Sequence, residues 1–326
     1  MLISIIIPSA GRRPKFLQRA IKSALIDDNT IQTEVIVVLN GKDGMAFDIS
    51  QSIQHPLVKY HKIEQGNVSK ARNYGLSLAQ GELIRFLDDD DYLYPEAAYQ
   101  QYLDFYFNDK LEINIYSIII KDQSSNFIKK ISPEILNNSF LGYSLNPNIA
   151  LPFIAVYKKN ILANIFWDEE CKFPEDEDWL RQVAKKKEYI FEYSDKVVGV
   201  WFQHPNERLS LPINNNRFCL NKLESIFSLF EGLEQENRNR YSLCMAYGLW
   251  SCIHGGFHFS PIYWTKIALY AKKLNPQARP KNTFFDTLFF IDPILLEWLI
   301  IPIRWISRYY RKIKSHMVKA AYVRKL

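Results

Sequence analysis

The sequence has little cysteine, and its few cysteines are not arranged for cross-linking or metal binding. Among 326 residues there are four cysteines, and none of them forms a C-x-x-C pair of the kind found in zinc and redox sites. This excludes a disulfide scaffold and a cysteine zinc site. Reduced thiols in the cytoplasm are the expectation.

A large excess of one charge and a long apolar run are also lacking. The chain has 41 basic and 35 acidic residues, and the resulting charge of +6 does not by itself indicate nucleic acid. The basic residues gather near the C-terminus instead of along an aromatic groove, so we expect no nucleic-acid partner. The apolar run at 294–303 has about half of the ~20 residues that span a bilayer, so no transmembrane helix is expected. The first eight residues indicate a buried strand and not a signal peptide.

What is present is the composition of a folded protein with a substantial core. Hydrophobic residues make up 48% and charged residues 23% of the chain, which excludes wholesale disorder. Strand signals disappear after about residue 214, and the remainder has helical patterns with many aromatics. We therefore predict a first domain over 1–210 and a helical region over 211–326.

The first ~110 residues alternate apolar strands with amphipathic helices, which is typical of a parallel sheet covered on both faces. Because ligands bind beyond the carboxyl ends of such strands, the loops Pro8–Arg13, Asn40–Gly44 and Asp88–Asp91 should converge on one crevice. The predicted strands are Leu2–Ile7, Glu34–Leu39, Leu57–Ile63 and Leu83–Leu87, and the helices are Pro14–Leu25, Val68–Ala79 and Pro95–Phe107.

Residues 112–202 show a mixed pattern. A helix is predicted over Glu175–Lys186, and the predicted strands are Ile113–Ile120, Phe127–Ile131, Ile149–Tyr157, Tyr189–Tyr193 and Val197–Phe202.

The run Asp88-Asp89-Asp90-Asp91 directly follows a predicted strand. Adjacent carboxylates repel one another, so a folded site needs a cation there or full exposure to water. Mg²⁺ and Mn²⁺ use one or two carboxylates and take further ligands from phosphate and water. The alternative is a solvated acidic loop.

Two further segments carry candidate chemistry. Arg72 near the start of a helix suits a phosphate or a ribose, although surface arginines are common. The acids of Glu175-Asp176-Glu177-Asp178 fit simple capping of a helix start, or one of them projects into the crevice as a general base.

Together these segments resemble family-2 glycosyltransferases, inverting enzymes with the GT-A fold. The resemblance covers about residues 1–205 and rests on four segments in the family's order. They are the opening strand Ser4–Ser9, the helix with Ala71-Arg72-Asn73, the segment Gly81–Asp91, and Glu175-Asp176 ahead of Trp179 and Arg181.

The resemblance implies an α/β GT-A (Rossmann-like) nucleotide-sugar-binding domain with a mainly helical C-terminal extension. Asp90 matches the residue of the D-x-D motif that holds Mn²⁺ or Mg²⁺ on the donor diphosphate. Asp176 matches the catalytic base, and Asp178 stays open because the acids are crowded. The implied donor-binding residues are Pro8, Ser9, Asn40, Arg72, Asp88, Asp89, His204 and Arg208.

One position departs from the family pattern. The family usually has two acidic residues after the second strand, and here Leu39 and Asn40 take their place. An amide presents a different hydrogen-bonding pattern to a nucleobase. A UDP-sugar remains the favoured donor.

The expected reaction is transfer of a sugar, with inversion, to a hydroxyl of a glycan or a lipid-linked acceptor, in cell-surface polysaccharide synthesis. Two alternatives stay open. A sugar nucleotidyltransferase is suggested by the basic loop Ala10–Lys15, and the other is a non-catalytic, membrane-associated carbohydrate-binding subunit.

The C-terminal segment suggests a second partner. From Arg304 to Leu326 there are eight basic residues and no acidic one, next to Trp298 and Trp305. Such a segment fits an interfacial helix on anionic lipid, and the alternative is a helix docked on its own domain. We expect a cytoplasmic protein, peripheral on the inner face of the cell membrane.

Overall fold

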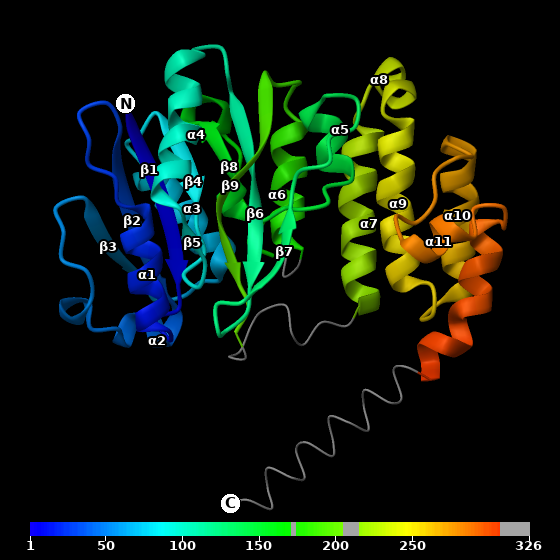
Figure 1. The fold of residues 1–326 in the computed structure, drawn as a ribbon, viewed down its shortest axis with the longest axis horizontal. Coiled ribbons are helices and arrows are strands. Elements are labelled where there is room, and N and C mark those ends of the chain that lie inside the picture. Colours follow the sequence, from blue (N-terminus) through cyan, green and yellow to red (C-terminus); the bar gives the residue numbers. More distant parts are fainter. Residues whose placement is uncertain (171–173, 205–214, 307–326) are drawn as a thin grey trace, which may run out of the picture. The chain divides into compact units, whose positions relative to one another are not determined.

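The computed structural model describes residues 1–170, 174–204 and 215–306, and these form two compact units, Met1–Leu211 and Pro212–Leu326. The first unit is built on a sheet with the strand order β3-β2-β1-β4-β8-β6-β9-β5, with β7 paired to β6 (Figure 1). Its strands are β1 (Leu2–Ser9), β2 (Gln32–Asn40), β3 (Val58–Ile63), β4 (Leu83–Phe86), β5 (Tyr92–Leu93), β6 (Ile113–Lys121), β7 (Phe127–Ile131), β8 (Ala155–Lys158) and β9 (Phe191–Phe202).

The first four long strands are parallel, as predicted. β1 pairs with β2 and β4, and β2 pairs with β3, so Ser9, Asn40 and Phe86 end their strands at one edge of the sheet. The helices α1 (Pro14–Ala24) and α3 (Val68–Leu78) pack on β1 and β2. A Cβ atom at Gly75 of α3 would lie 2.4 Å from Ile6 Cγ2, so only glycine permits this close approach.

The second half of the sheet is mixed. β8 is antiparallel to both β4 and β6, and β9 is parallel to β6. Two reversals restore the direction, so β9 ends at the same edge of the sheet as β4. The C-terminal end of β9 therefore lies beside the acidic run, although it follows that run by more than 100 residues in the sequence.

Three sequence expectations need correction here. The strand expected over Ile149–Tyr157 is a 3₁₀ turn at Pro152–Ile154 followed by the short β8. The two strands expected over Tyr189–Tyr193 and Val197–Phe202 are one strand, β9. Its pairing with β6 jumps from Ser194 to Val197, so the polar residues between them bulge out of the ladder.

The third correction concerns the expected loop at Asn40–Gly44, where the short helix α2 (Gly41–Ala46) begins directly after β2. Gly41 has a φ of +71°, a left-handed conformation that suits glycine at this abrupt turn. The other helical segments of the first unit are η1 (Ile49–Gln51), α4 (Pro95–Phe107), α5 (Phe140–Leu145), η3 (Lys159–Leu162) and α6 (Glu175–Ala184).

The second unit is helical in the part that the structure describes, as predicted. It contains α7 (Asn215–Glu231), α8 (Gln235–Arg240), α9 (Ser242–Gly256), α10 (Pro261–Leu274), α11 (Thr283–Thr287) and a helix over 293–306. Trp250, Phe257 and Trp264 are fully buried, whereas Tyr263 is exposed. Some of the many aromatic residues of this region therefore fill its core. Within 1–306, apart from the two gaps, no helix is long and apolar enough to cross a membrane.

Candidate active site

The acidic run lies directly beyond β4, and its four carboxylates are not equivalent. Asp89 and Asp91 are buried, whereas the side chains of Asp88 and Asp90 are 28% and 16% exposed. Asp91 accepts a hydrogen bond from the backbone N–H of Phe202 at 2.9 Å, which fixes the end of β9 to the acidic run. Asp88 and Asp90 are therefore the carboxylates that a ligand reaches most easily.

Two residues of the β1 loop hold the buried Asp89. Ser9 Oγ donates to Asp89 Oδ2 at 2.5 Å, and Arg13 Nη2 donates to Asp89 Oδ1 at 2.6 Å. Burial and the neighbouring Asp90 raise the pKa of Asp89 to about 6, although Arg13 and Ser9 act in the opposite direction.

Arg13 also binds the residue that matches the metal position. Its Nη1 donates to Asp90 Oδ2 at 2.5 Å, so one guanidinium spans two carboxylates of the run. Gly11, with a φ of +73°, makes the turn that brings Arg13 back over the strand ends. The basic loop Ala10–Lys15 suggests only the nucleotidyltransferase alternative in the sequence, and no local pattern there pairs it with the aspartates.

His204, at the end of β9, completes this cluster. Its Nε2 lies 2.9 Å from Asp90 Oδ2 and 2.9 Å from Arg13 Nη1. The imidazole is packed beside Phe16 and Phe202, and its buried Nδ1 has no hydrogen-bond partner among the residues that the structure describes. Arg208, the other residue expected from this segment, lies outside the described residues.

Arg72 connects the acidic run to the start of α6. Its Nη2 donates to Asp88 Oδ1 at 2.8 Å and its Nη1 donates to Asp176 Oδ1 at 2.9 Å. The guanidinium is buried and its Cζ lies 4.1 Å from the ring centre of Trp167, which stacks on Trp179. Arg72 thus holds two carboxylates in place and does not point into solvent.

Asp176 sits in the first turn of α6, with its side chain 23% exposed. Burial, together with the neighbouring Glu175 and Asp88, raises its pKa well above the usual range, and Arg72 opposes this shift. Glu175 is also buried beside Arg72, and burial raises its pKa in turn. Asp178 follows two residues later, and at 100° per residue it projects from nearly the opposite side of the helix.

The remaining donor-side residues lie at the ends of β1 and β2. Pro8 and Ser9 are buried at the end of β1, and Asn40 Nδ2 donates to the Ser9 carbonyl at 3.2 Å. Together with Arg72, the aspartates and His204, these side chains surround one edge of the sheet. The convergence expected from the parallel strands is present.

The contacts of Arg19 were not foreseen from the sequence. Its Nη2 donates to the Asp90 carbonyl at 2.6 Å, and its guanidinium packs on Tyr92 and Phe202. A lone arginine on the predicted α1 gave no signal for this contact, because Tyr92 and Phe202 reach it only through the folded sheet.

Among the described residues, no three histidine, cysteine, aspartate or glutamate side chains are grouped so that they alone could hold a metal ion. Asp90 and Asp88 nonetheless offer hard carboxylate oxygens at a partly open edge. That donor set fits Mg²⁺ or Mn²⁺, which complete their coordination with phosphate and water.

With this fold and this site, the chain belongs to a known family: residues 4–166 match glycosyl transferase family 2. Among relatives, it is 36% identical over 140 residues to the Bacillus subtilis minor teichoic acid biosynthesis protein GgaB, and this match covers 40% of this chain and 15% of GgaB. It is 26% identical over 219 residues to the Staphylococcus aureus poly(ribitol-phosphate) β-N-acetylglucosaminyltransferase TarS, and this match covers 64% of this chain and 37% of TarS. The matches therefore span well under half the length of these two relatives.

A solved structure has the same fold. The crystal structure of residues 1–349 of S. aureus TarS in complex with UDP-GlcNAc aligns with a TM-score of 0.59 at 19% identity, covering 83% of this chain and 79% of that one.

Proposed function

We propose that this chain transfers a sugar from a nucleoside-diphosphate donor to a hydroxyl group of a glycan or lipid-linked acceptor, with inversion at the anomeric carbon. The observation that supports the proposal is the Arg72 bridge, in which one guanidinium pairs with both Asp88 and Asp176. With Asp88 on the donor and Asp176 as the base, as we propose, the two sides of the reaction would be adjacent. Membership of the family and the UDP-GlcNAc in the TarS structure favour a UDP-sugar as the donor.

Asp176 is the proposed general base. It is partly exposed, and its raised pKa makes it a stronger proton acceptor than an ordinary aspartate. Its carboxylate takes the proton from the acceptor hydroxyl, whose oxygen then forms the new bond to the anomeric carbon as the bond to the diphosphate breaks. Arg72 keeps this carboxylate oriented.

Asp90 is the proposed ligand of Mg²⁺ or Mn²⁺, with Asp88 beside it. When bound, the metal would supply Lewis-acid stabilisation of the leaving diphosphate. Arg13 and His204 contact Asp90, so these two side chains would lie close enough to the donor phosphates to bind them. Asn40 and Pro8–Ser9 would line the nucleoside end.

The test separates the base from the donor site. Asp176→Asn should lower transfer by about 10²–10⁴-fold, because a positioned base is removed, while metal-dependent UDP binding is retained. Asp178→Asn is the matched control on the same helix and should keep most activity. Asp90→Ala should lose both transfer and metal-dependent binding. Full activity of Asp176→Asn would refute the base assignment. Undiminished transfer in EDTA would refute the proposed dependence of transfer on a metal ion.

We further propose that the chain works at the inner, anionic face of a cell membrane. The helix over 293–306 exposes apolar side chains next to the basic segment 307–326, which lies outside the described residues. The exposed side chains are Leu295, Trp298, Leu299, Ile303, Trp305 and Ile306. Flotation of the chain with phosphatidylglycerol vesicles, but not with phosphatidylcholine vesicles, is the expected result. Equal recovery with both would contradict an electrostatic contribution.

A further inference from the structure

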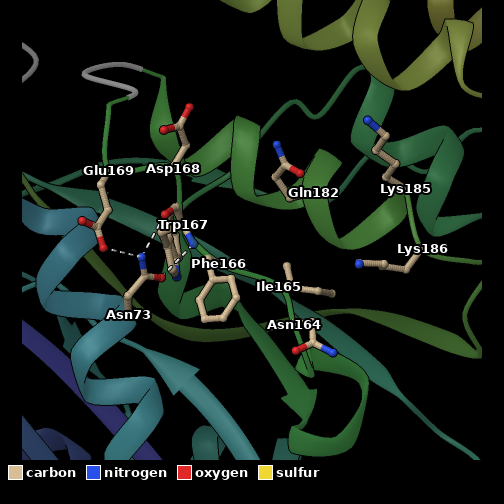
Figure 2. Close-up of a pocket in the computed structure, with 10 residues that line it drawn as sticks. All are labelled: Asn73, Asn164, Ile165, Phe166, Trp167, Asp168, Glu169, Gln182, Lys185 and Lys186. Atoms are coloured by element: carbon tan, nitrogen blue, oxygen red, sulfur yellow. Dashed lines mark hydrogen bonds between the residues drawn. The ribbon is translucent and has the colours of Figure 1, made fainter.

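Both units expose apolar side chains, but the surroundings of these side chains differ. In the first unit, Phe166 is 65% exposed and lines a cavity of about 870 Å³ together with charged side chains. These are Asp168, Glu169, Lys185 and Lys186 (Figure 2). A single apolar side chain among charged ones is ordinary for a protein surface. In the second unit, by contrast, exposed apolar side chains gather on two helices.

The first of these helices is α10, which is exposed along one side over its whole length. Its exposed residues fall at helical spacing, so they share one face. They are Ile262, Tyr263, Lys266, Leu269, Tyr270 and Lys273. The opposite face carries Trp264, Ala268 and Ala271, which are buried in the core of the unit. The exposed face of α10 is therefore apolar apart from two lysines and two tyrosine hydroxyls.

The helix over 293–306 has a similar exposed face without any charge. Its exposed residues are Leu295, Trp298, Leu299, Pro302, Ile303, Trp305 and Ile306. The only acidic residue in either helix, Glu297, is fully buried. His254 Nδ1 lies 2.7 Å from Glu297 Oε1, and Arg304 Nη1 lies 2.9 Å from Glu297 Oε2. These partners hold the carboxylate inward, so the two exposed faces, both within the described residues, present no acidic side chain.

Two contacts place these helices side by side in opposite directions. Trp298 Nε1 donates to Thr265 Oγ1 at 3.1 Å. Lys272, further along α10, pairs with Asp292, which caps the start of the other helix. Trp298 is itself one of the exposed residues, so the exposed faces of the two helices meet at its contact with Thr265. We call this joint surface the two-helix face.

Three features of the two-helix face favour an anionic lipid bilayer as its partner. Its aromatic residues are tryptophans and tyrosines, which prefer the headgroup level of a membrane. Its charged residues, Lys266 and Lys273, are both basic. The chain also continues from Ile306 into the segment 307–326, which has seven basic residues and no acidic one. A second copy of the chain would bring further positive charge to this surface, whereas anionic lipid would compensate it.

We propose that the two-helix face lies on an anionic bilayer, with its apolar side chains at the acyl boundary and Lys266 and Lys273 at the headgroups. α10 is then a second membrane contact beside the C-terminal helix. The inference rests on the membrane association proposed above and extends it. Binding comes from a folded surface with an apolar contribution that salt does not screen, and not from the basic segment alone.

Co-sedimentation of the full chain with vesicles of equimolar phosphatidylglycerol and phosphatidylcholine measures the partition coefficient. I262S/L269S should lower it about tenfold, since two apolar side chains are lost from the lipid contact. The factor should be the same at physiological salt and at about 1 M salt. The matched control F127S/I128S changes two residues on β7 that are 62% and 51% exposed, against 72% and 57% for Ile262 and Leu269. It should partition as the wild type does.

The charges of the two-helix face are tested separately with K266E/K273E. This variant should partition about tenfold more weakly at physiological salt, because each lysine near an anionic surface is replaced by a repelled carboxylate. At about 1 M salt the difference from the wild type should nearly vanish. K129E/K130E reverses two exposed lysines on β7 and is the matched control, which should behave as the wild type does at both salt concentrations.

Partitioning of I262S/L269S equal to that of the wild type would overturn the proposal. If L295S/L299S then still partitions less, the C-terminal helix alone contacts lipid, and the proposed membrane association stands without α10. A wild type that does not partition onto these vesicles would refute both. Analytical ultracentrifugation without vesicles covers the remaining occupant: a wild-type dimer that I262S/L269S converts to a monomer would assign the face to a second copy and also overturn the proposal.

Discussion

Replacing Arg72 by methionine tests whether this buried arginine holds the site together. Methionine keeps most of the packing on Trp167 but leaves Asp88 and Asp176 without their shared cation. Breaking a buried ion pair costs about 3–5 kcal/mol, and because these carboxylates are 28% and 23% exposed, water offsets part of it. We expect a loss of about 2–4 kcal/mol in the free energy of unfolding.

The loss should depend on the carboxylate that remains. Asp176→Asn removes a carboxyl group whose charged form is already disfavoured. When it is combined with Arg72→Met, the double variant should regain about 1–2 kcal/mol of the free energy of unfolding that Arg72→Met alone loses. Urea unfolding followed by tryptophan fluorescence measures the cycle, because Trp167 and Trp179 stack beside Arg72. Arg12→Met is the matched control: it breaks the exposed pair with Asp43 and should cost at most ~0.5 kcal/mol.

Additivity would refute this reasoning. If the effects of Arg72→Met and Asp176→Asn sum to within about 0.5 kcal/mol, the pair between these two side chains adds nothing to stability, and Arg72 stabilises the fold through Asp88 and packing instead.

Three further predictions concern separate parts of the first unit. Gly75→Ala should destabilise by about 1–3 kcal/mol in urea, because the new Cβ meets Ile6, whereas Ser77→Ala in the same helix should change little. A carboxyl whose pKa is raised in the folded state loses its contribution to stability as the pH rises above its unfolded pKa. In EDTA, the melting temperature of the wild type relative to that of Asp176→Asn should therefore fall from pH 4 to pH 8. A constant difference in melting temperature would contradict the raised pKa. Arg13→Ala should weaken UDP binding by about tenfold in calorimetry, and unchanged affinity would remove Arg13 from the donor site.

The first half of the fold could be predicted because its strands are buried on both faces. β1 and β2 are almost continuous apolar runs, and such runs are recognisable without knowledge of their neighbours. β9 was divided wrongly because its interior contains Ser194, Asp195 and Lys196. The bulge that accommodates them exists only through its pairing with β6, and no local pattern encodes that pairing.

The same distinction applies to the site. The aspartates, Arg72 and Asp176 stand in recognisable local patterns, and the structure brings them together. Arg13 contacts Asp90 across 77 positions and His204 contacts it across 114, through a turn at Gly11 and through two reversals of the sheet. Contacts of this kind depend on topology, so the contacts of Arg13 with Asp90 and His204 could not be predicted from the sequence alone.

The acidic run also shows why metal affinity should depend on the nucleotide. Three of its four carboxylates have an arginine partner within the protein, since Arg13 binds Asp89 and Asp90 and Arg72 binds Asp88, and these pairs reduce the repulsion among them. If a divalent ion binds Asp90 as proposed, it would displace Arg13 from that carboxylate. A donor diphosphate would offer further oxygens to the ion and a new partner to the arginine. Mn²⁺ should therefore bind weakly alone and at least tenfold more tightly with UDP present, with the same factor for UDP when Mn²⁺ is present. Calorimetric titration in each order measures both factors. Equal Mn²⁺ affinity with and without UDP would show that Arg13 does not compete with the metal ion for Asp90.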